Sequence, residues 1–367
     1  MVLVRHCPAR GRHPRDPRPS ASTCHVLPGS GGDPVTAGNV PHAPALDPTD
    51  YSPEGVEPSV PVESPGRRVK DWACAIRDPL MTRLLRGRHP ELANLGFDRI
   101  LRNGSGISVR RLRAMEARRL GGLAGRRILV LGCGFGNDLL DWLPYRPALV
   151  LGVDLVNYGR CWRRIEERGR RAGAEVRCLQ ADLTAASWDF VEAGTLDVVS
   201  SRAVLEHVTA LPALLSGAVR ALRPGGLFEA AYGPLWFGPN GDHMFSPDPD
   251  DDYNHLVLGE ADYAAYVAKA KAGWMRRETA CDGPFLVERG LFSRLKADAY
   301  LRAFEAAGLR PMLRLVSLAL SRAARYRDRF PDRWAGLIAR HRIREIDLIA
   351  EGCVYLGERP CEETTSP

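Results

Sequence analysis

Between residues 128 and 231, short apolar runs alternate with segments of helical periodicity. The apolar runs occupy residues 128–131, 148–153, 175–179, 196–200 and 226–231, and the helical patterns lie at residues 137–142, around Trp162 and Ile165, and at residues 211–222. Strands that alternate with helices build right-handed βαβ units, in which the strands run parallel. The chain is therefore expected to have an α/β fold with a mostly parallel sheet.

The first apolar run leads directly into a glycine-rich turn that contains Gly132, Cys133, Gly134 and Gly136, with Asn137 next. Glycines let the backbone approach a ligand closely, and the start of a helix offers unpaired N–H groups. The turn is therefore predicted to bind a cofactor, although it also fits a dinucleotide loop or a tight strand–helix corner. The dinucleotide pattern G-x-G-x-x-G needs a glycine where Asn137 stands, so a ligand without a pyrophosphate is favoured.

Acidic residues stand at the ends of the next two predicted strands. Asp154 follows the second strand, where its carboxylate can accept hydrogen bonds from ribose hydroxyls. Asp182 follows the third strand, where it can accept from an adenine amino group. Each could instead cap the next helix or turn. Because open α/β sheets bind ligands at the carboxyl ends of their strands, the two acids favour a nucleoside site.

With these motifs the chain resembles the class I S-adenosylmethionine-dependent methyltransferases, in particular their small-molecule, type 11-like group. The resemblance is carried by the glycine turn, by Asp154 and Asp182, by residues 196–208 with their Leu-Glu-His, and by Leu-Arg-Pro-Gly-Gly at residues 222–226. It implies S-adenosylmethionine as the methyl donor. We also assign Leu155, Leu183 and Ser201 to the donor site.

The resemblance also implies a Rossmann-like sheet of seven mostly parallel strands with the last strand reversed, and it covers roughly residues 100–360. Apolar runs at residues 311–318 and 348–356 fit the final strand pair of that fold, with a basic helix around residues 334–343 between them. The expected organisation is a disordered Pro/Gly-rich tail (1–66), a basic helical lead-in (67–127), an S-adenosylmethionine-binding half (128–233), an acceptor-binding insertion (234–296) and a C-terminal helix with the strand pair (297–360).

The insertion at residues 234–296 is expected to bind the methyl acceptor. Trp236, Phe237 and Tyr253 could line an apolar pocket, or they could pack in the core of a loop. The acidic run at residues 248–252, near His243 and His255, is expected to be a solvated loop because no fixed spacing of metal ligands appears. No metal site is predicted.

Two histidines are candidates for a general base. His243 lies in the insertion, and His207 follows the fourth strand. An imidazole with its ordinary pKa near 6.5 can take a proton at neutral pH. His243 is preferred because a base must reach the acceptor, whereas His207 could instead cap a helix or order the end of the strand.

The positive charge of the chain is concentrated before the glycine turn. Residues 71–127 hold 13 basic and 5 acidic side chains, and a predicted helix there carries Arg110, Arg111 and Arg113 on one face. Such a face can be solvated surface, or it can attract an acidic acceptor, an anionic membrane face or RNA. RNA recognition usually adds stacking aromatics, and only Trp72 and Phe97 occur here, so nucleic acid is not the expected partner.

The nine cysteines are scattered at irregular intervals, which favours reduced thiols in the cytoplasm. No apolar run is long enough to predict a membrane span. The chain is therefore interpreted as a methyltransferase that acts on an oxygen or nitrogen of a metabolite or natural product. The alternatives are a nucleic-acid methyltransferase or binding protein that uses residues 71–127, and a nicotinamide-dependent oxidoreductase.

Overall fold

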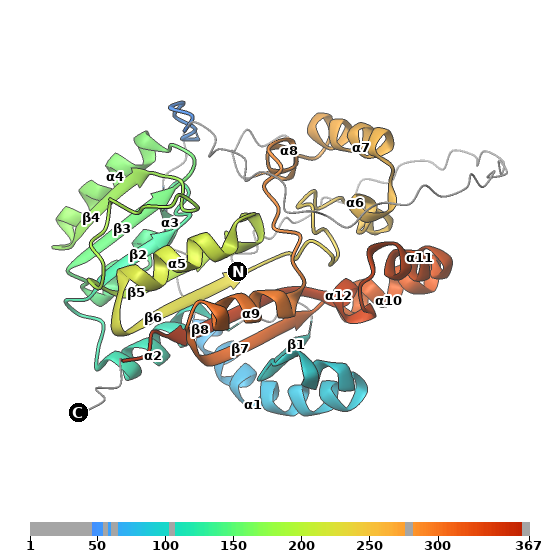
Figure 1. Ribbon diagram of the computed structural model, residues 1–367, viewed down its shortest axis with the longest axis horizontal. Helices are drawn as coiled ribbons and strands as arrows, with labels where there is room; N and C mark the ends of the chain where they lie inside the picture. The colour runs from blue at the N-terminus through green and yellow to red at the C-terminus, as the bar shows by residue number, and fades with distance from the viewer. Residues whose placement is uncertain (1–45, 54–57, 60–64, 103–106, 276–281, 362–367) are drawn as a thin grey trace. The chain divides into compact units, whose positions relative to one another are not determined.

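A computed structural model describes residues 46–53, 58–59, 65–102, 107–275 and 282–361. Their centre is one eight-stranded sheet (Figure 1). In spatial order its strands are β1 (Arg99–Arg102), β7 (Arg310–Leu318), β8 (Ala350–Glu358), β6 (Leu222–Tyr232), β5 (Leu196–Arg202), β2 (Arg127–Leu131), β3 (Leu149–Asp154) and β4 (Glu175–Gln180). The five strands expected between residues 128 and 231 are all present, which confirms the Rossmann-like α/β fold.

The last strand is reversed, as expected. β8 pairs antiparallel with both of its neighbours, and every other pair in the sheet is parallel. The strand count differs from the expected seven because β1 adds a parallel edge strand beside β7. It lies inside the lead-in that was expected to be helical. Ile100 and Leu101 are both fully buried on opposite faces of the sheet, and a four-residue strand with only these two apolar residues between its arginines is too short to give a strand pattern.

Helices cover both faces of the sheet. Leu129 and Leu131 of β2 point into the core shared with α5 (Leu211–Ala221) and α9 (Ala297–Ala306). Their neighbours in β2 point into the opposite core, which α2 (Val109–Leu120) and α4 (Gly159–Arg171) cover. A strand buried on both faces reads as a continuous apolar run, which is why the sequence identifies it well.

The segment between β6 and α9 has a small core of its own. It contains η4 (Pro249–Asp251), α6 (Asn254–Val257), α7 (Glu260–Ala272) and α8 (Gly283–Glu288). Met244 and three residues of α7 form its buried cluster. This segment is the predicted insertion after the fifth expected strand.

The remaining helices flank the last strands. They are α1 (Pro65–Arg88) with η1 (Pro90–Leu95) before β1, and α10 (Leu320–Arg329), α11 (Pro331–His341) and α12 (Glu345–Ile349) between β7 and β8. α11 is the predicted basic helix. Leu348 and Ile349, expected to begin the last strand, instead end α12. No helix in the described part of the chain is both long and apolar enough to cross a membrane.

Residues 46–53 are ordered, although they were assigned to a disordered tail. The N–H groups of Arg160 and Cys161, in the first turn of α4, donate to Asp50 Oδ2 (3.0 Å) and Ser52 Oγ (3.1 Å). The N-cap residue of α4, Tyr158, makes no capping bond with its side chain. These residues therefore cap α4 from more than 100 positions away in sequence, a partnership that local pattern cannot reveal. Residues 1–45 lie outside the described residues.

Two arginines of the basic lead-in pair with buried carboxylates of the fold. Arg113 is fully buried, with Nη1 2.8 Å from Glu116 Oε2 and 2.7 Å from Glu229 Oε1. Its guanidinium also stacks 3.3 Å from the centre of the Trp142 ring. Arg119 pairs with Glu358, the last residue of β8. The interpretation of Arg113 as part of a surface charge is therefore wrong.

Candidate functional site

The glycine turn joins β2 to α3 (Asn137–Leu140), and its three glycines all have positive φ, at 59°, 51° and 103°. A Cβ at Gly132 would lie 2.2 Å from Val204 Cγ2, and one at Gly136 would lie 2.7 Å from Ile165 Cγ1. A Cβ at Gly134 would meet no protein atom within 4 Å. The outer glycines are therefore needed for packing, and the middle one faces open space where a ligand can approach.

The helix that follows the turn is shorter than expected. The predicted helix over residues 137–142 is one turn of α3, followed by η2 (Leu143–Tyr145). Its dipole is correspondingly small, since the aligned peptides that build the dipole are few. Ligand recognition at this turn must therefore come from the backbone of the turn and from neighbouring side chains.

Asp154 ends β3 beside the turn and holds it. Its Oδ2 accepts from the Gly134 N–H (2.7 Å) and its Oδ1 from the Val156 N–H (2.8 Å). Burial raises the pKa of Asp154 to about 6, although these backbone hydrogen bonds oppose the shift. Asp154 does not cap α4, which removes the alternative role. Each carboxylate oxygen keeps a second lone pair for a ligand.

Trp162 and Cys133 hold the turn from behind. Trp162 Nε1, from α4, donates to the Gly134 carbonyl (2.7 Å), and the Cys133 N–H donates to the Val153 carbonyl (3.2 Å). Burial raises the pKa of the Cys133 thiol well above its usual value, so the thiol stays neutral. Sequence reasoning treated Trp162 only as an apolar helix position, and nothing in its local pattern indicates this hydrogen bond.

The other predicted donor residues lie at the carboxyl ends of β3, β4 and β5 or just beyond them. Asp182 Oδ1 accepts from the N–H (2.8 Å) and Oγ1 (2.7 Å) of Thr184, so it does cap its own turn while remaining half-buried. Leu183 packs in the core, and the Leu155 carbonyl accepts from Gln180 Nε2 (3.0 Å). The Ser201 hydroxyl is buried and has no partner among the described residues. Gly134 and Asp154 are joined directly, by the hydrogen bond from the Gly134 N–H to the Asp154 carboxylate.

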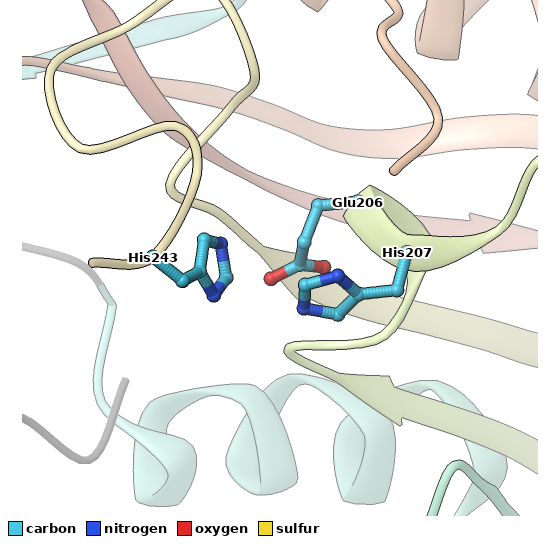
Figure 2. A group of neighbouring side chains, drawn as sticks. All are labelled: Glu206, His207 and His243. Atoms are coloured by element: carbon cyan, nitrogen blue, oxygen red, sulfur yellow. The ribbon is translucent and has the colours of Figure 1, made fainter. Parts of the chain in front are cut away.

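The two candidate bases come together although they are distant in sequence. His207 ends η3 (Leu205–His207), which follows β5, and His243 comes from the insertion. Their ring centres are 4.6 Å apart and the rings cross at 72° (Figure 2). Phe292 packs against both rings, at 5.3 and 5.6 Å. His207 does not cap α5, whose N-cap residue is Ala210.

Glu206, the neighbour of His207, points its carboxylate toward the two imidazoles (Figure 2). Burial raises the pKa of Glu206 to about 8. Burial also lowers the pKa of His207 to about 4 and that of His243 well below its usual value. At neutral pH both rings are therefore uncharged. Sequence analysis singled out neither Glu206 nor its approach to His243.

Of the three aromatic residues predicted to line an acceptor pocket, one packs near the two candidate bases. Trp236 packs against Phe292 (4.9 Å between ring centres), which itself contacts both histidines. Tyr253 is fully buried, and its hydroxyl donates to the Leu348 carbonyl (2.8 Å), so it is a core residue. Phe237 lies beside His341 of α11 instead of the two candidate bases.

The acidic run in the insertion is held by α10. Asp252 is 1% exposed and pairs with Arg322 (2.5 Å), and Asp250 pairs with Arg329 (2.8 Å). The expected solvated loop is therefore a salt-bridged one. His255 Nε2 donates to the Trp236 carbonyl (2.6 Å), away from this run.

A family model described as "Methyltransferase domain" matches residues 129–230. This range contains the glycine turn, Asp154, Asp182 and the Leu-Glu-His of η3. Residues 129–230 thus match a methyltransferase domain, as the resemblance implied.

Curated relatives match the same part of the chain. The chain is 33% identical over 107 residues to a ubiquinone biosynthesis O-methyltransferase of Idiomarina loihiensis, covering 29% of this chain and 41% of the relative. It is 31% identical over 107 residues to the enzyme of the same name from Acinetobacter baylyi, covering 29% and 43%. The chain thus spans less than half the length of these relatives.

Solved structures with similar folds include an S-adenosylmethionine-dependent methyltransferase from Mesorhizobium loti, at 18% identity and a TM-score of 0.39 over 67% of this chain and 96% of that one. Another is the geranyl diphosphate C-methyltransferase of Streptomyces coelicolor, at 16% identity and a TM-score of 0.38 over 68% and 78%. At these scores neither bears on the site.

Proposed function

We propose that this protein transfers a methyl group from S-adenosylmethionine to an oxygen or nitrogen of a small molecule. The observation that carries the proposal is the pairing of Gly134 with Asp154. The glycine faces open space, and the carboxylate that holds its N–H keeps lone pairs for ribose hydroxyls.

In this proposal the donor half of the site consists of the glycine turn, Asp154, Leu155, Asp182, Leu183 and Ser201. Asp154 binds the ribose and Asp182 the adenine amino group. The unpartnered hydroxyl of Ser201 supplies a further polar contact, which would remove the cost of leaving a buried hydroxyl unpaired.

The acceptor half consists of Glu206, His207, His243, Trp236 and Phe292. Methyl transfer is an in-line displacement at a sulfonium, so the protein must mainly align the two reactants and exclude water, which can contribute about 7–11 kcal/mol. The apolar faces of Trp236 and Phe292 suit that task. The curated relatives are O-methyltransferases by name, which favours an oxygen acceptor over nitrogen.

The role of His243 as the base, with His207 as the alternative, stays a prediction. Both rings are neutral and can accept a proton, and they lie 4.6 Å apart. His243→Asn and His207→Asn would separate them. The base variant should lower turnover by about 100-fold or more while leaving donor affinity intact.

The two rival functions have less support. A nucleic-acid partner would use the charge of residues 71–127, from which Arg113 is withdrawn by its burial beside Glu116 and Glu229, whereas Arg83, Arg110 and Arg118 are exposed. A dinucleotide would need the sixth-position glycine that Asn137 replaces.

The proposal is tested by incubating the full chain with S-adenosylmethionine and a panel of phenols, catechols, aliphatic alcohols and amines. Mass spectrometry should detect a monomethylated product together with one equivalent of S-adenosylhomocysteine. If only RNA oligomers, included in the same panel, are methylated, the small-molecule assignment is wrong.

A further inference from the structure

Three side chains with metal-binding atoms meet beside the donor half of the site. Glu206 and His207 come from η3, and His243 comes from the insertion. One ligand atom from each of the three lies within 4.8 Å of the others. Figure 2 shows the carboxylate and both imidazoles facing a common space.

Backbone carbonyls fix the protonation of both rings. His207 Nδ1 lies 2.9 Å from the Leu291 carbonyl, and His243 Nε2 lies 3.3 Å from the Pro234 carbonyl. A carbonyl only accepts, so these ring nitrogens carry the protons. His207 Nε2 and His243 Nδ1 are then left as lone-pair donors. A histidine that ligates a metal typically has its other N–H held in this way, often by a backbone carbonyl.

The Glu206 carboxylate is half-satisfied. Its Oε1 accepts from the Gly233 N–H (2.8 Å), whereas Oε2 is buried and has no partner among the described residues. Glu206 as a whole is 1% exposed. If the group is ionised, its charge is buried beside two neutral rings, and if it is protonated, its O–H has no acceptor. Either protonation state of Glu206 costs free energy unless a bound ligand interacts with Oε2.

We propose that Glu206, His207 and His243 bind a divalent transition-metal ion. Two imidazoles with one carboxylate suit Zn²⁺ and its first-row neighbours, whereas Mg²⁺ and Ca²⁺ prefer oxygen ligands alone. A cation supplies the positive charge that a buried carboxylate lacks and takes up both free nitrogen lone pairs. The proposal does not depend on methyl transfer, since it rests on these three side chains only.

A metal held by three protein ligands would keep a coordination position for an acceptor oxygen. An acceptor hydroxyl bound there would lose its proton to solvent more readily, since a metal lowers the pKa of a bound hydroxyl. Its oxygen would then attack the methyl carbon as the donor's carbon–sulfur bond breaks. In that case His243 is a metal ligand, and no histidine base is needed.

The test is calorimetric titration of the chelator-treated full chain with ZnCl₂, for the wild type, Glu206→Gln and His243→Asn. Glutamine keeps an acceptor for the Gly233 N–H, and asparagine tolerates the positive φ of residue 243, which is 61°. His89→Gln is the matched control, because His89 lies at η1 and pairs with Glu91. Circular dichroism reports folding of every variant.

The expected result is one Zn²⁺ per wild-type chain, with affinity about 100-fold weaker in each ligand variant and unchanged in the control. Co²⁺ substitution should give visible absorption bands that Glu206→Gln abolishes. Absence of stoichiometric Zn²⁺ binding to the wild type, or wild-type Zn²⁺ affinity in folded Glu206→Gln and His243→Asn, would overturn the proposal. Titration of the same samples with S-adenosylmethionine reports the donor half separately, so failure of one proposal is distinguishable from failure of the other.

Discussion

The two halves of the candidate site are built in different ways. The donor half comes from consecutive βα units, and its key residues are joined by backbone hydrogen bonds to Asp154. The acceptor half joins η3 to an insertion, and its key residues are buried titratable side chains with an unsatisfied oxygen. The difference shows that backbone hydrogen bonds shape the glycine turn of the donor half, whereas the acceptor half depends on buried titratable side chains from two distant segments.

The largest effect is expected where the sheet supports both halves, at the buried Arg113. Burial opposes ionisation of Glu229, but the charges of Arg113 and Arg202 overcome it and hold the pKa of Glu229 low. Arg113→Ala removes the nearest cation from this buried carboxylate, leaves Arg202 at 3.7 Å, and should lower the free energy of unfolding by about 3–5 kcal/mol. Urea denaturation measures the loss. The exposed Arg118→Ala on the same helix should change stability by less than about 0.5 kcal/mol, and equal effects would refute the network.

The next effect concerns the cap of α4, the helix that carries Trp162 to the donor half. Asp50→Ala combined with Ser52→Ala removes both acceptors for its first-turn N–H groups. Each cap is worth about 0.5–2 kcal/mol, so the pair should lower the melting temperature by several degrees. Glu167→Ala, on the exposed side of the same helix, serves as the control. An unchanged melting temperature in the double variant would show that residues 46–53 are dispensable.

Substitutions at two glycines of the turn distinguish a role in packing from a role in ligand binding. Gly132→Ala places a methyl 2.2 Å from Val204 Cγ2 and should lower stability by about 1–3 kcal/mol. Gly134→Ala meets no protein atom within 4 Å, so its stability cost is limited to the backbone strain of about 1–2 kcal/mol. Its donor affinity should nevertheless fall at least about fivefold, because the new methyl occupies ligand space. Intact affinity for S-adenosylmethionine in Gly134→Ala would place the donor elsewhere.

The smallest effect is a pH dependence of the donor half. Ribose hydroxyls bind the ionised form of Asp154, and burial raises the pKa of that carboxyl to about 6. The free protein therefore takes up a proton as the pH falls below 6, and donor binding must release it. Affinity for S-adenosylmethionine should fall by up to about tenfold between pH 6 and pH 5 and be flat above pH 7. Asp154→Asn should abolish this dependence; a slope that persists would assign it to another group.

The same comparison explains what the sequence could predict. The donor half was predictable because parallel strands bring their carboxyl ends to one edge, so Gly134 and Asp154 had to meet. The acceptor half was not, because the approach of His243 to Glu206 depends on how an insertion folds over the sheet. The capping of α4 by Asp50 and the burial of Arg113 were not predicted for the same reason. Each depends on a partner more than 100 residues away in the sequence. Strand β1 was not predicted because the two apolar residues between Arg99 and Arg102 give too little pattern.

The most direct test of the account is calorimetric titration of the wild type and Asp154→Ala with S-adenosylmethionine and with NADH. Asp189→Ala, an exposed acid beyond β4, is the control. The account predicts that the wild type and the control bind one S-adenosylmethionine per chain and no NADH. Asp154→Ala, with its fold intact by circular dichroism, should bind the donor about 5- to 150-fold more weakly, corresponding to about 1–3 kcal/mol for the lost acceptor. Equal donor affinity in a folded Asp154→Ala, or wild-type binding of NADH in preference to S-adenosylmethionine, would contradict it.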